Sequence, residues 1–81
     1  MEVKKSVRII SRNNETETIS FKLKDNRECE YLIDNCRRVK TLPKRICYSG
    51  NLFLSREGIE LEKNALLWDQ LNNTGVLVYQ E

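Results

Sequence analysis

Residues 25–43 read DNRECEYLIDNCRRVKTLP, and the spacing of their apolar side chains predicts a helix. The apolar positions recur at steps of three and four, which is the pattern of an amphipathic helix with one buried stripe. These positions are Cys29, Leu32, Ile33, Cys36 and Val39. Asp25 is a suitable N-cap, with Glu28 three residues later as in a capping box. Pro43 disfavours helical geometry in the residue before it, so the helix is predicted to end by Leu42.

The segment before this helix has the period of two that is typical of half-buried strands. Apolar residues alternate with polar ones over residues 3–9 and again, more regularly, over residues 18–24. Asn13 and Asn14 lie between the two runs, and asparagine tolerates the positive φ angles of turns. The first 24 residues therefore predict a β-hairpin.

The segment after Pro43 contains short apolar runs separated by turn residues. Strands are predicted at residues 46–48, 52–54 and 59–61, with turns at Gly50 and Gly58 between them. Residues 65–71 read as a short helical turn, in which Trp68 is interpreted as a side chain that fills the core. A last strand is predicted at residues 76–79, after a turn that includes Gly75.

The predicted order is β-β-α-β-β-β, which resembles the ubiquitin-like β-grasp superfold. That resemblance implies an α+β roll, with a mixed sheet and one main helix packed across it. It also implies that the last strand pairs with the first strand in parallel. At 81 residues the chain is expected to form a single domain spanning 1–81.

Composition narrows the classes of function. The chain has no histidine and no C-x-x-C pair, so neither a zinc site nor a histidine-activated nucleophile is expected. The three cysteines are an odd number and lie among apolar neighbours, which indicates reduced, structural thiols. No apolar run approaches the roughly 18 residues that a membrane span needs, and no secretory signal is evident, so we expect a cytoplasmic or nuclear protein without a membrane span. We predict a non-enzymatic protein that requires no cofactor and no metal.

Charge divides the chain into two unlike parts. Residues 1–48 hold 12 Lys and Arg against 7 Asp and Glu, whereas residues 49–81 hold 2 against 5. The net charge of +2 therefore conceals a basic part and an acidic part. Complementary charge sets partner choice and association rate, so this pattern suggests association head to tail with another copy or a similar domain.

Several motifs resemble the CIDE-N (CAD) domain family within the ubiquitin-like superfold. CRRVKTLP at 36–43 is similar to the family's cysteine-containing helix that leads into a Leu-Pro. LFLSREGIEL at 52–61 is similar to its strand with an acidic turn, and NNTGVLVY at 72–79 to its final turn and strand. The similarity spans roughly residues 29–79.

This resemblance implies a regulatory protein–protein interaction domain of the apoptotic DNA-fragmentation system or a related pathway. Members are similar in docking a basic face of one domain on an acidic face of the next. By position, the basic face would comprise Lys5, Arg8, Lys22, Lys24, Arg37 and Arg38, and the acidic face Glu57, Glu60, Glu62 and Asp69.

Two other functions are open at this point. A small nucleic-acid-binding domain could use the basic excess of residues 1–48, although the scarcity of aromatic residues argues against a base-stacking platform. A ubiquitin-like adaptor outside the CIDE-N family would share the expected fold. Conjugation as a modifier would require a Gly-Gly terminus, whereas this chain ends in Tyr79, Gln80 and Glu81.

Overall fold

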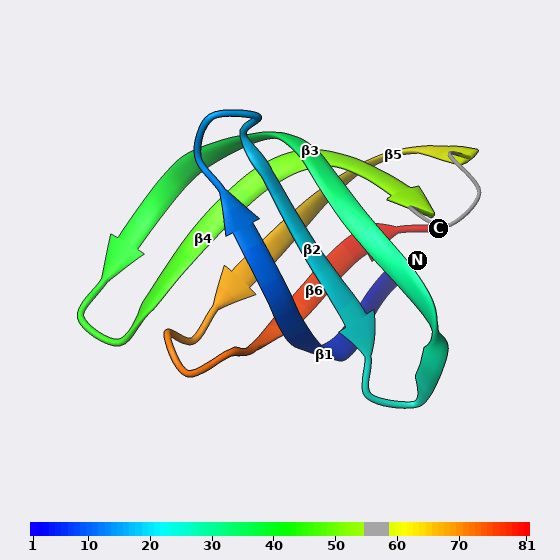
Figure 1. Ribbon diagram of the computed structural model, residues 1–81, viewed down its shortest axis with the longest axis horizontal. Helices are drawn as coiled ribbons and strands as arrows, with labels where there is room; N and C mark the ends of the chain where they lie inside the picture. Colours follow the sequence, from blue (N-terminus) through cyan, green and yellow to red (C-terminus); the bar gives the residue numbers. More distant parts are fainter. Residues whose placement is uncertain (55–58) are drawn as a thin grey trace.

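The chain forms a closed barrel of six antiparallel β-strands (Figure 1). The computed structural model describes residues 1–54 and 59–81, and side chains are described outside residues 54–63. The strands are β1 (Glu2–Asn13), β2 (Thr18–Leu23), β3 (Asn26–Leu42), β4 (Arg45–Leu54), β5 (Ile59–Asp69) and β6 (Thr74–Gln80). The described residues contain no helix, so the predicted α+β β-grasp is wrong and the fold is all-β.

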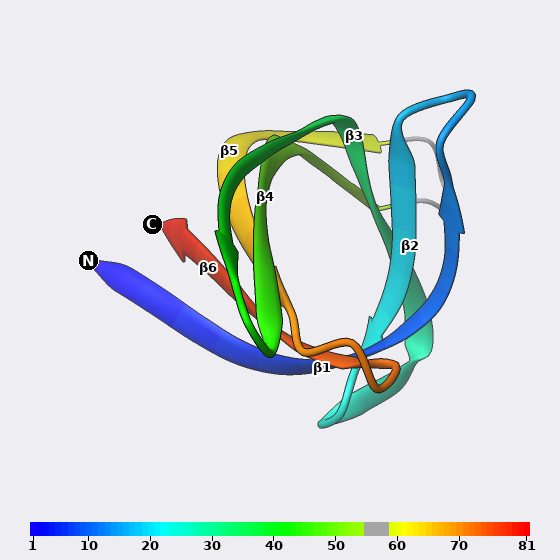
Figure 2. The same ribbon diagram turned by 90° about the vertical axis from the view of Figure 1, so that its left-hand side faces the viewer.

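Each strand pairs with the next along the chain, and β6 returns to pair with β1. The two termini therefore lie side by side (Figure 2). The Glu81 amide donates a hydrogen bond to the Met1 carbonyl at 2.8 Å, which joins the two terminal backbones. The pairing of first and last strands agrees with the prediction, but its direction does not: β1 and β6 are antiparallel.

The predicted N-terminal hairpin is confirmed, and its alternating residues supply much of the core. Val7 and Ile9 of β1 and Ile19 and Phe21 of β2 point into the barrel. The ring of Phe21, which is fully buried, stacks on Tyr31 of β3 with 6.0 Å between centroids. The other strands complete the cluster with Ile33, Leu52, Ala65, Leu67 and Leu77.

The predicted helix is instead the long strand β3, and a β-bulge explains the misleading period. Asp34 pairs with Asn51 and Arg37 pairs with Ser49, which leaves Asn35 and Cys36 together opposite Gly50. Such an extra residue shifts the inward-facing positions from a step of two to a step of three. The step from buried Ile33 to Cys36, which packs against the core, arises in this way.

The predicted helical turn at residues 65–71 is also wrong, because most of it belongs to β5. Ala65 and Leu67 alternate into the core, as strand residues do. Trp68 lies between the buried residues Leu67 and Asp69, is only half-buried and does not fill the core. The guanidinium of Arg45 covers its ring instead, at 4.7 Å from the centroid.

Leu71, in the β5–β6 turn, has an unfavourable backbone conformation. Its φ is 62°, a left-handed value that costs a non-glycine residue roughly 1 kcal/mol. Its side chain is 53% exposed, so little packing is lost when it is replaced. We expect Leu71→Asn to raise the free energy of unfolding by roughly 0.5–1 kcal/mol, because asparagine tolerates this φ. Leu71→Ala is the control for side-chain loss and should give no gain in thermal denaturation.

Candidate functional site

The six residues predicted to form one basic face lie in three separate places. Arg8, Lys22 and Lys24 line one groove on the outside of the barrel. Arg37 and Arg38 belong to the hairpin that joins β3 to β4. Lys5 contributes to neither, and its ammonium lies 3.6 Å from the carboxylate of Asp25. Among the described residues, these cations therefore belong to two basic surfaces instead of one continuous face.

The first surface is residues 37–45 of the β3–β4 hairpin, which we term the basic hairpin. Its cations are Arg37, Arg38, Lys40, Lys44 and Arg45, and all five are exposed. No acidic residue occurs between Asp34 and Glu57. Lys40, Lys44 and Arg45 were not predicted as part of a basic face, although the acid-free run RRVKTLPKR identifies them.

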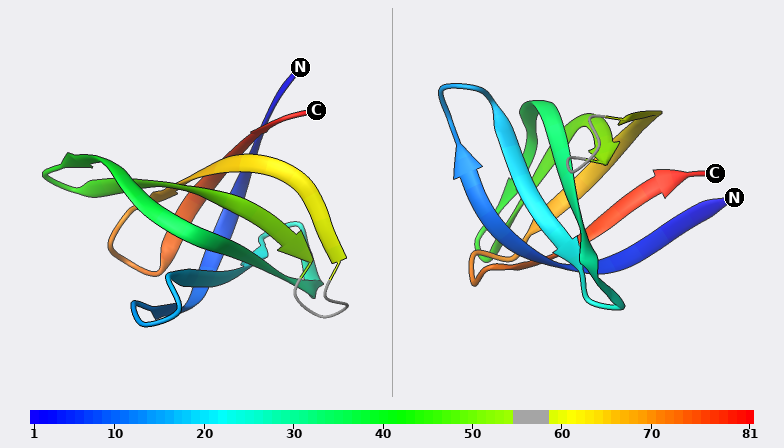
Figure 3. Two further views of the ribbon diagram at one scale, coloured as in Figure 1. Left: turned by 90° about the horizontal axis from the view of Figure 1, so that it is seen from above. Right: turned by 45° about the vertical axis from the view of Figure 1, so that its right-hand side comes forward.

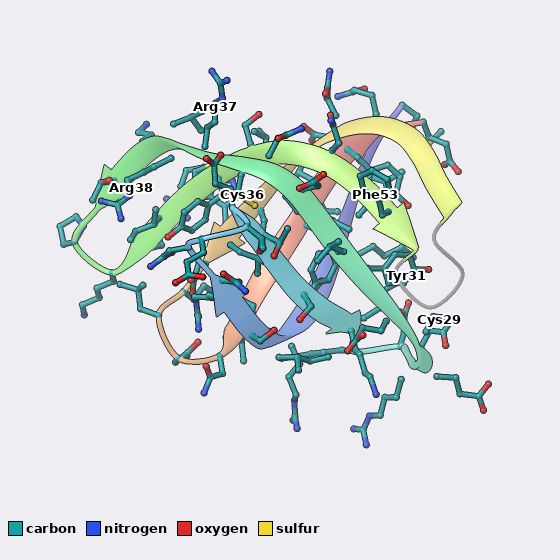
Figure 4. The ribbon with its side chains drawn as sticks, turned by 45° about the horizontal axis from the view of Figure 1, so that its top comes forward. Cys29, Tyr31, Cys36, Arg37, Arg38 and Phe53 are labelled. Carbon is teal, nitrogen blue, oxygen red and sulfur yellow. The ribbon has the colours of Figure 1, made fainter. Side chains whose placement is uncertain are left out.

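The basic hairpin lies at one end of the molecule, opposite the turn between β2 and β3 (Figures 1 and 3). Leu42 pairs with Arg45, so Pro43 and Lys44 form its tip. Arg37 extends away from the ribbon, and Arg38 lies nearer this end (Figure 4). The stacking of Arg45 on Trp68 attaches the tip to β5, which fixes one cation of the set.

One edge of the basic hairpin is unpaired. The Cys36 amide donates to the Glu17 carbonyl at 2.9 Å, which is where β3 parts from the β1–β2 hairpin. Among the described residues, 37–42 of β3 pair only with β4. Cations on such an edge oppose aggregation by strand pairing, which is the simplest structural reason for their presence. A row of free backbone donors and acceptors beside them also makes this edge a candidate binding surface.

The second surface is a groove of about 650 Å³ across β1, β2 and the start of β3. Four cations and one carboxylate line it together with two apolar side chains. The lining residues are Arg8, Ile10, Lys22, Leu23, Lys24, Arg27 and Glu30. We term this surface the basic groove. Arg27 was not predicted as part of a basic face.

Strand register brings the cations of the basic groove together. Arg8 of β1 lies directly opposite Lys22 of β2, and Lys22 in turn lies opposite Glu30 of β3. Like charges directly opposite on neighbouring strands are destabilising. Within the described part of the chain none of the four cations forms an ion pair. Arg8 opposite Lys22 is therefore unfavourable, and Glu30 on the other side of Lys22 offsets part of that cost.

Of the four residues predicted to form the acidic face, Asp69 is the one whose side chain the structure describes. Glu57 lies outside the described residues, and so do the side chains of Glu60 and Glu62. Asp69 does not lie on a surface: it is 1% exposed and points inward from β5. Arg12 binds it through two hydrogen bonds, from Nε to Oδ2 at 2.7 Å and from Nη2 to Oδ1 at 2.9 Å. Asp69 is therefore structural, and its placement on an acidic interaction face is corrected.

Thiol chemistry receives no support from the site geometry. Burial raises the pKa of Cys36 to about 11, so its thiol stays protonated at neutral pH. Burial likewise raises the pKa of Cys47. Among the described residues there is no cluster of three or more side chains that could hold a metal ion. The described residues also contain no helix long and apolar enough to cross a membrane.

Comparisons with known proteins give no relative: no family model, curated protein or solved structure matches the chain. Nothing in them identifies a CIDE-N family. The segment CRRVKTLP, which resembles that family's helix, forms the end of β3 and the tip of the basic hairpin. The two basic surfaces are therefore the features that indicate a function.

Proposed function

We propose that this protein is a non-enzymatic nucleic-acid-binding domain that contacts the phosphate backbone through its basic hairpin. The observation that carries the proposal is the set of five exposed cations within residues 37–45, with no acidic residue among them. Neutralising phosphates with Lys and Arg releases condensed counterions, which supplies most of the affinity of sequence-independent binding. Three of the five are arginines, whose guanidinium groups match phosphate oxygens in a bidentate manner.

The geometry favours a duplex over a single strand. A two-stranded β-ribbon fits the major groove of DNA, and the basic hairpin has that form at its tip. Binders of single strands instead use exposed aromatic rings on which bases stack. Here the Trp68 ring lies under Arg45, and Tyr31 stacks on Phe21 inside the barrel. We therefore propose duplex binding with little sequence preference.

Titration of a labelled 20-base-pair DNA by fluorescence anisotropy at several salt concentrations would test this function. We expect affinity to fall linearly on a log–log plot against salt, because each phosphate contact contributes about 0.9 to the slope. The double variant Arg37→Gln/Arg38→Gln should bind more weakly and reduce the slope by about 2. A single strand of the same length should bind less tightly than the duplex.

The matched control is Lys4→Gln/Lys5→Gln, which also removes two adjacent cations but lies outside the basic hairpin. Both double variants have the same net charge, so a difference between them reports location and not overall charge. Equal losses in the two variants would contradict a specific role for the basic hairpin. Absence of salt-dependent binding by the unaltered protein would overturn the nucleic-acid function itself.

A second candidate function is protein–protein interaction, which the unpaired edge of β3 favours. An extended acidic segment of a partner could add as a strand beside residues 37–42 and neutralise their cations. In the head-to-tail association predicted from the sequence, the partner surface is instead an acidic face of a similar domain. Asp69 is buried and is not available for such a face. Light scattering at low and high salt tests self-association directly: a concentration-dependent increase in mass at low salt would favour it. A monomer throughout would leave a different protein as the only partner of this kind.

A further inference from the structure

The basic groove differs from the basic hairpin in shape and in chemistry. It is concave, and its volume of about 650 Å³ lies within the range of small-molecule sites, roughly 300–1,000 Å³. It also lies toward the β2–β3 turn, at the other end of the molecule from the hairpin tip (Figure 1). A ligand of the groove need not contact the hairpin.

The cations of the groove define the charged part of its ligand. Arg8 and Arg27 offer guanidinium groups, and Lys22 and Lys24 offer ammonium groups, around the same concavity. Their excess over Glu30 gives the lining a formal charge of +3. Phosphate groups suit this combination, because they accept bidentate bonds from arginine and point-charge contacts from lysine.

The remaining lining residues indicate that the ligand is more than phosphate. Ile10 is 48% exposed, because it follows the inward-facing Ile9 in β1 and so lies on the outside of the barrel. Leu23 provides a second apolar contact. Glu30 would repel a phosphate but accepts hydrogen bonds from hydroxyl or amino groups. A sugar and a base supply such donors and apolar surface in one molecule.

We propose that the basic groove binds a nucleoside phosphate, with its phosphates on Arg8, Lys22, Lys24 and Arg27 and its sugar or base against Ile10, Leu23 and Glu30. This site is independent of the proposed duplex binding by the basic hairpin. The nucleotide is either free or the phosphorylated end of a nucleic-acid strand, since both present the same chemistry.

Titration of the ¹⁵N-labelled protein with ATP, followed by amide chemical shifts in NMR, would test the proposal. We expect ATP to shift the amides of Arg8, Lys22 and Arg27, and to bind more tightly than inorganic tripolyphosphate. Arg8→Gln/Arg27→Gln should weaken ATP binding at least about tenfold, because each variant position loses a charge-assisted bond. The control Lys4→Gln/Lys5→Gln removes as much charge outside the groove, and the spectra show whether each variant is folded.

Glu30→Gln separates a nucleotide site from a simple cationic patch. This variant should bind tripolyphosphate more tightly, because the Glu30 carboxylate repels phosphate. It should also show a smaller preference for ATP over tripolyphosphate, because the carboxylate accepts hydrogen bonds from the nucleoside. Equal binding of ATP and tripolyphosphate, or shifts confined to residues 37–45, would overturn the proposal without affecting the duplex-binding test. A 5′-phosphorylated oligonucleotide that displaces ATP from the groove, where its 5′-hydroxyl counterpart does not, would identify a strand end as the ligand. If neither oligonucleotide displaces ATP, the ligand is the free nucleotide.

Discussion

Gly50→Val is expected to remove roughly 3 kcal/mol or more of folding stability, because the barrel has no space for a side chain at this position. Gly50 is buried in β4, where an added Cβ would lie 2.6 Å from the carbonyl oxygen of Asp34 and closer still to the Ile33 side chain. The oxygen belongs to the backbone of β3 and cannot move without displacing the strand. Gly50 also lies opposite the bulge formed by Asn35 and Cys36. The backbones of β3 and β4 therefore approach closely where β3 has its extra residue.

Thermal denaturation provides the measurement, since each 1 kcal/mol shifts Tm by about 4–8 °C in a domain of this size. The matched control is Asn51→Val, which introduces the same side chain at the next position of β4. Asn51 is only half-buried and points to the outer face, so its replacement should change stability by less than about 0.5 kcal/mol. A Tm for Gly50→Val equal to that of Asn51→Val would show that β3 and β4 are not as close as described.

The same bulge explains why the fold could be predicted only in part. Period-two alternation in the first 24 residues identified β1 and β2 correctly, because the core residues there follow an almost regular pleat. In β3 the bulges break the alternation, and the resulting steps of three and four are indistinguishable from a helical stripe. Asn35, whose φ is 53°, supplies the left-handed residue that the bulge needs. Only the pairing partner β4 could have resolved this ambiguity.

A long strand was likewise mistaken for two short ones around Gly50. Glycine usually marks a turn, and Ser49 and Asn51 beside it strengthened that interpretation. In the barrel Gly50 lies within β4 and is required for close approach between backbones. Such an approach depends on residues far apart in the sequence, so local turn chemistry could not have indicated it.

The basic surfaces show the same division between local and non-local information. Charge counting correctly located an excess of cations in the first part of the chain, and the adjacency of Arg37 and Arg38 needs no fold. Grouping Arg8 with Arg27 requires the register of β1, β2 and β3. The inward orientation of Arg12 could not be predicted either, because the bulge after Ile9 reverses which residues of β1 face the core.

Removing Arg12 should be the second strongly destabilising change, since it leaves the buried carboxylate of Asp69 without its cation. Loss of one partner of a buried ion pair costs about 3–5 kcal/mol, and we expect about 3 for Arg12→Met because the Arg12 side chain is 34% exposed. The Leu71 amide, 2.9 Å from Oδ1, would then be the remaining described donor to Asp69. Arg8→Met, an exposed cation on the same strand, is the control and should change stability by less than about 0.5 kcal/mol.

A double-mutant cycle and a pH series distinguish loss of the pair from loss of packing. Arg12→Met/Asp69→Leu should regain much of the stability lost by Arg12→Met, because no unpaired charge stays buried.

Burial acts to raise the pKa of Asp69, but the hydrogen bonds from Arg12 and Leu71 and the charge of Arg12 outweigh it and lower that pKa. A lowered folded-state pKa stabilises the protein above the unfolded value, about 3.9, and this contribution is lost as pH falls through the folded-state pKa. The free energy of unfolding, measured by urea denaturation from pH 7 downward, should therefore decrease below about pH 4 in the unaltered protein and less in Asp69→Asn. Identical acid profiles for the two proteins, or a double variant as unstable as Arg12→Met, would show that the ion pair does not stabilise the barrel.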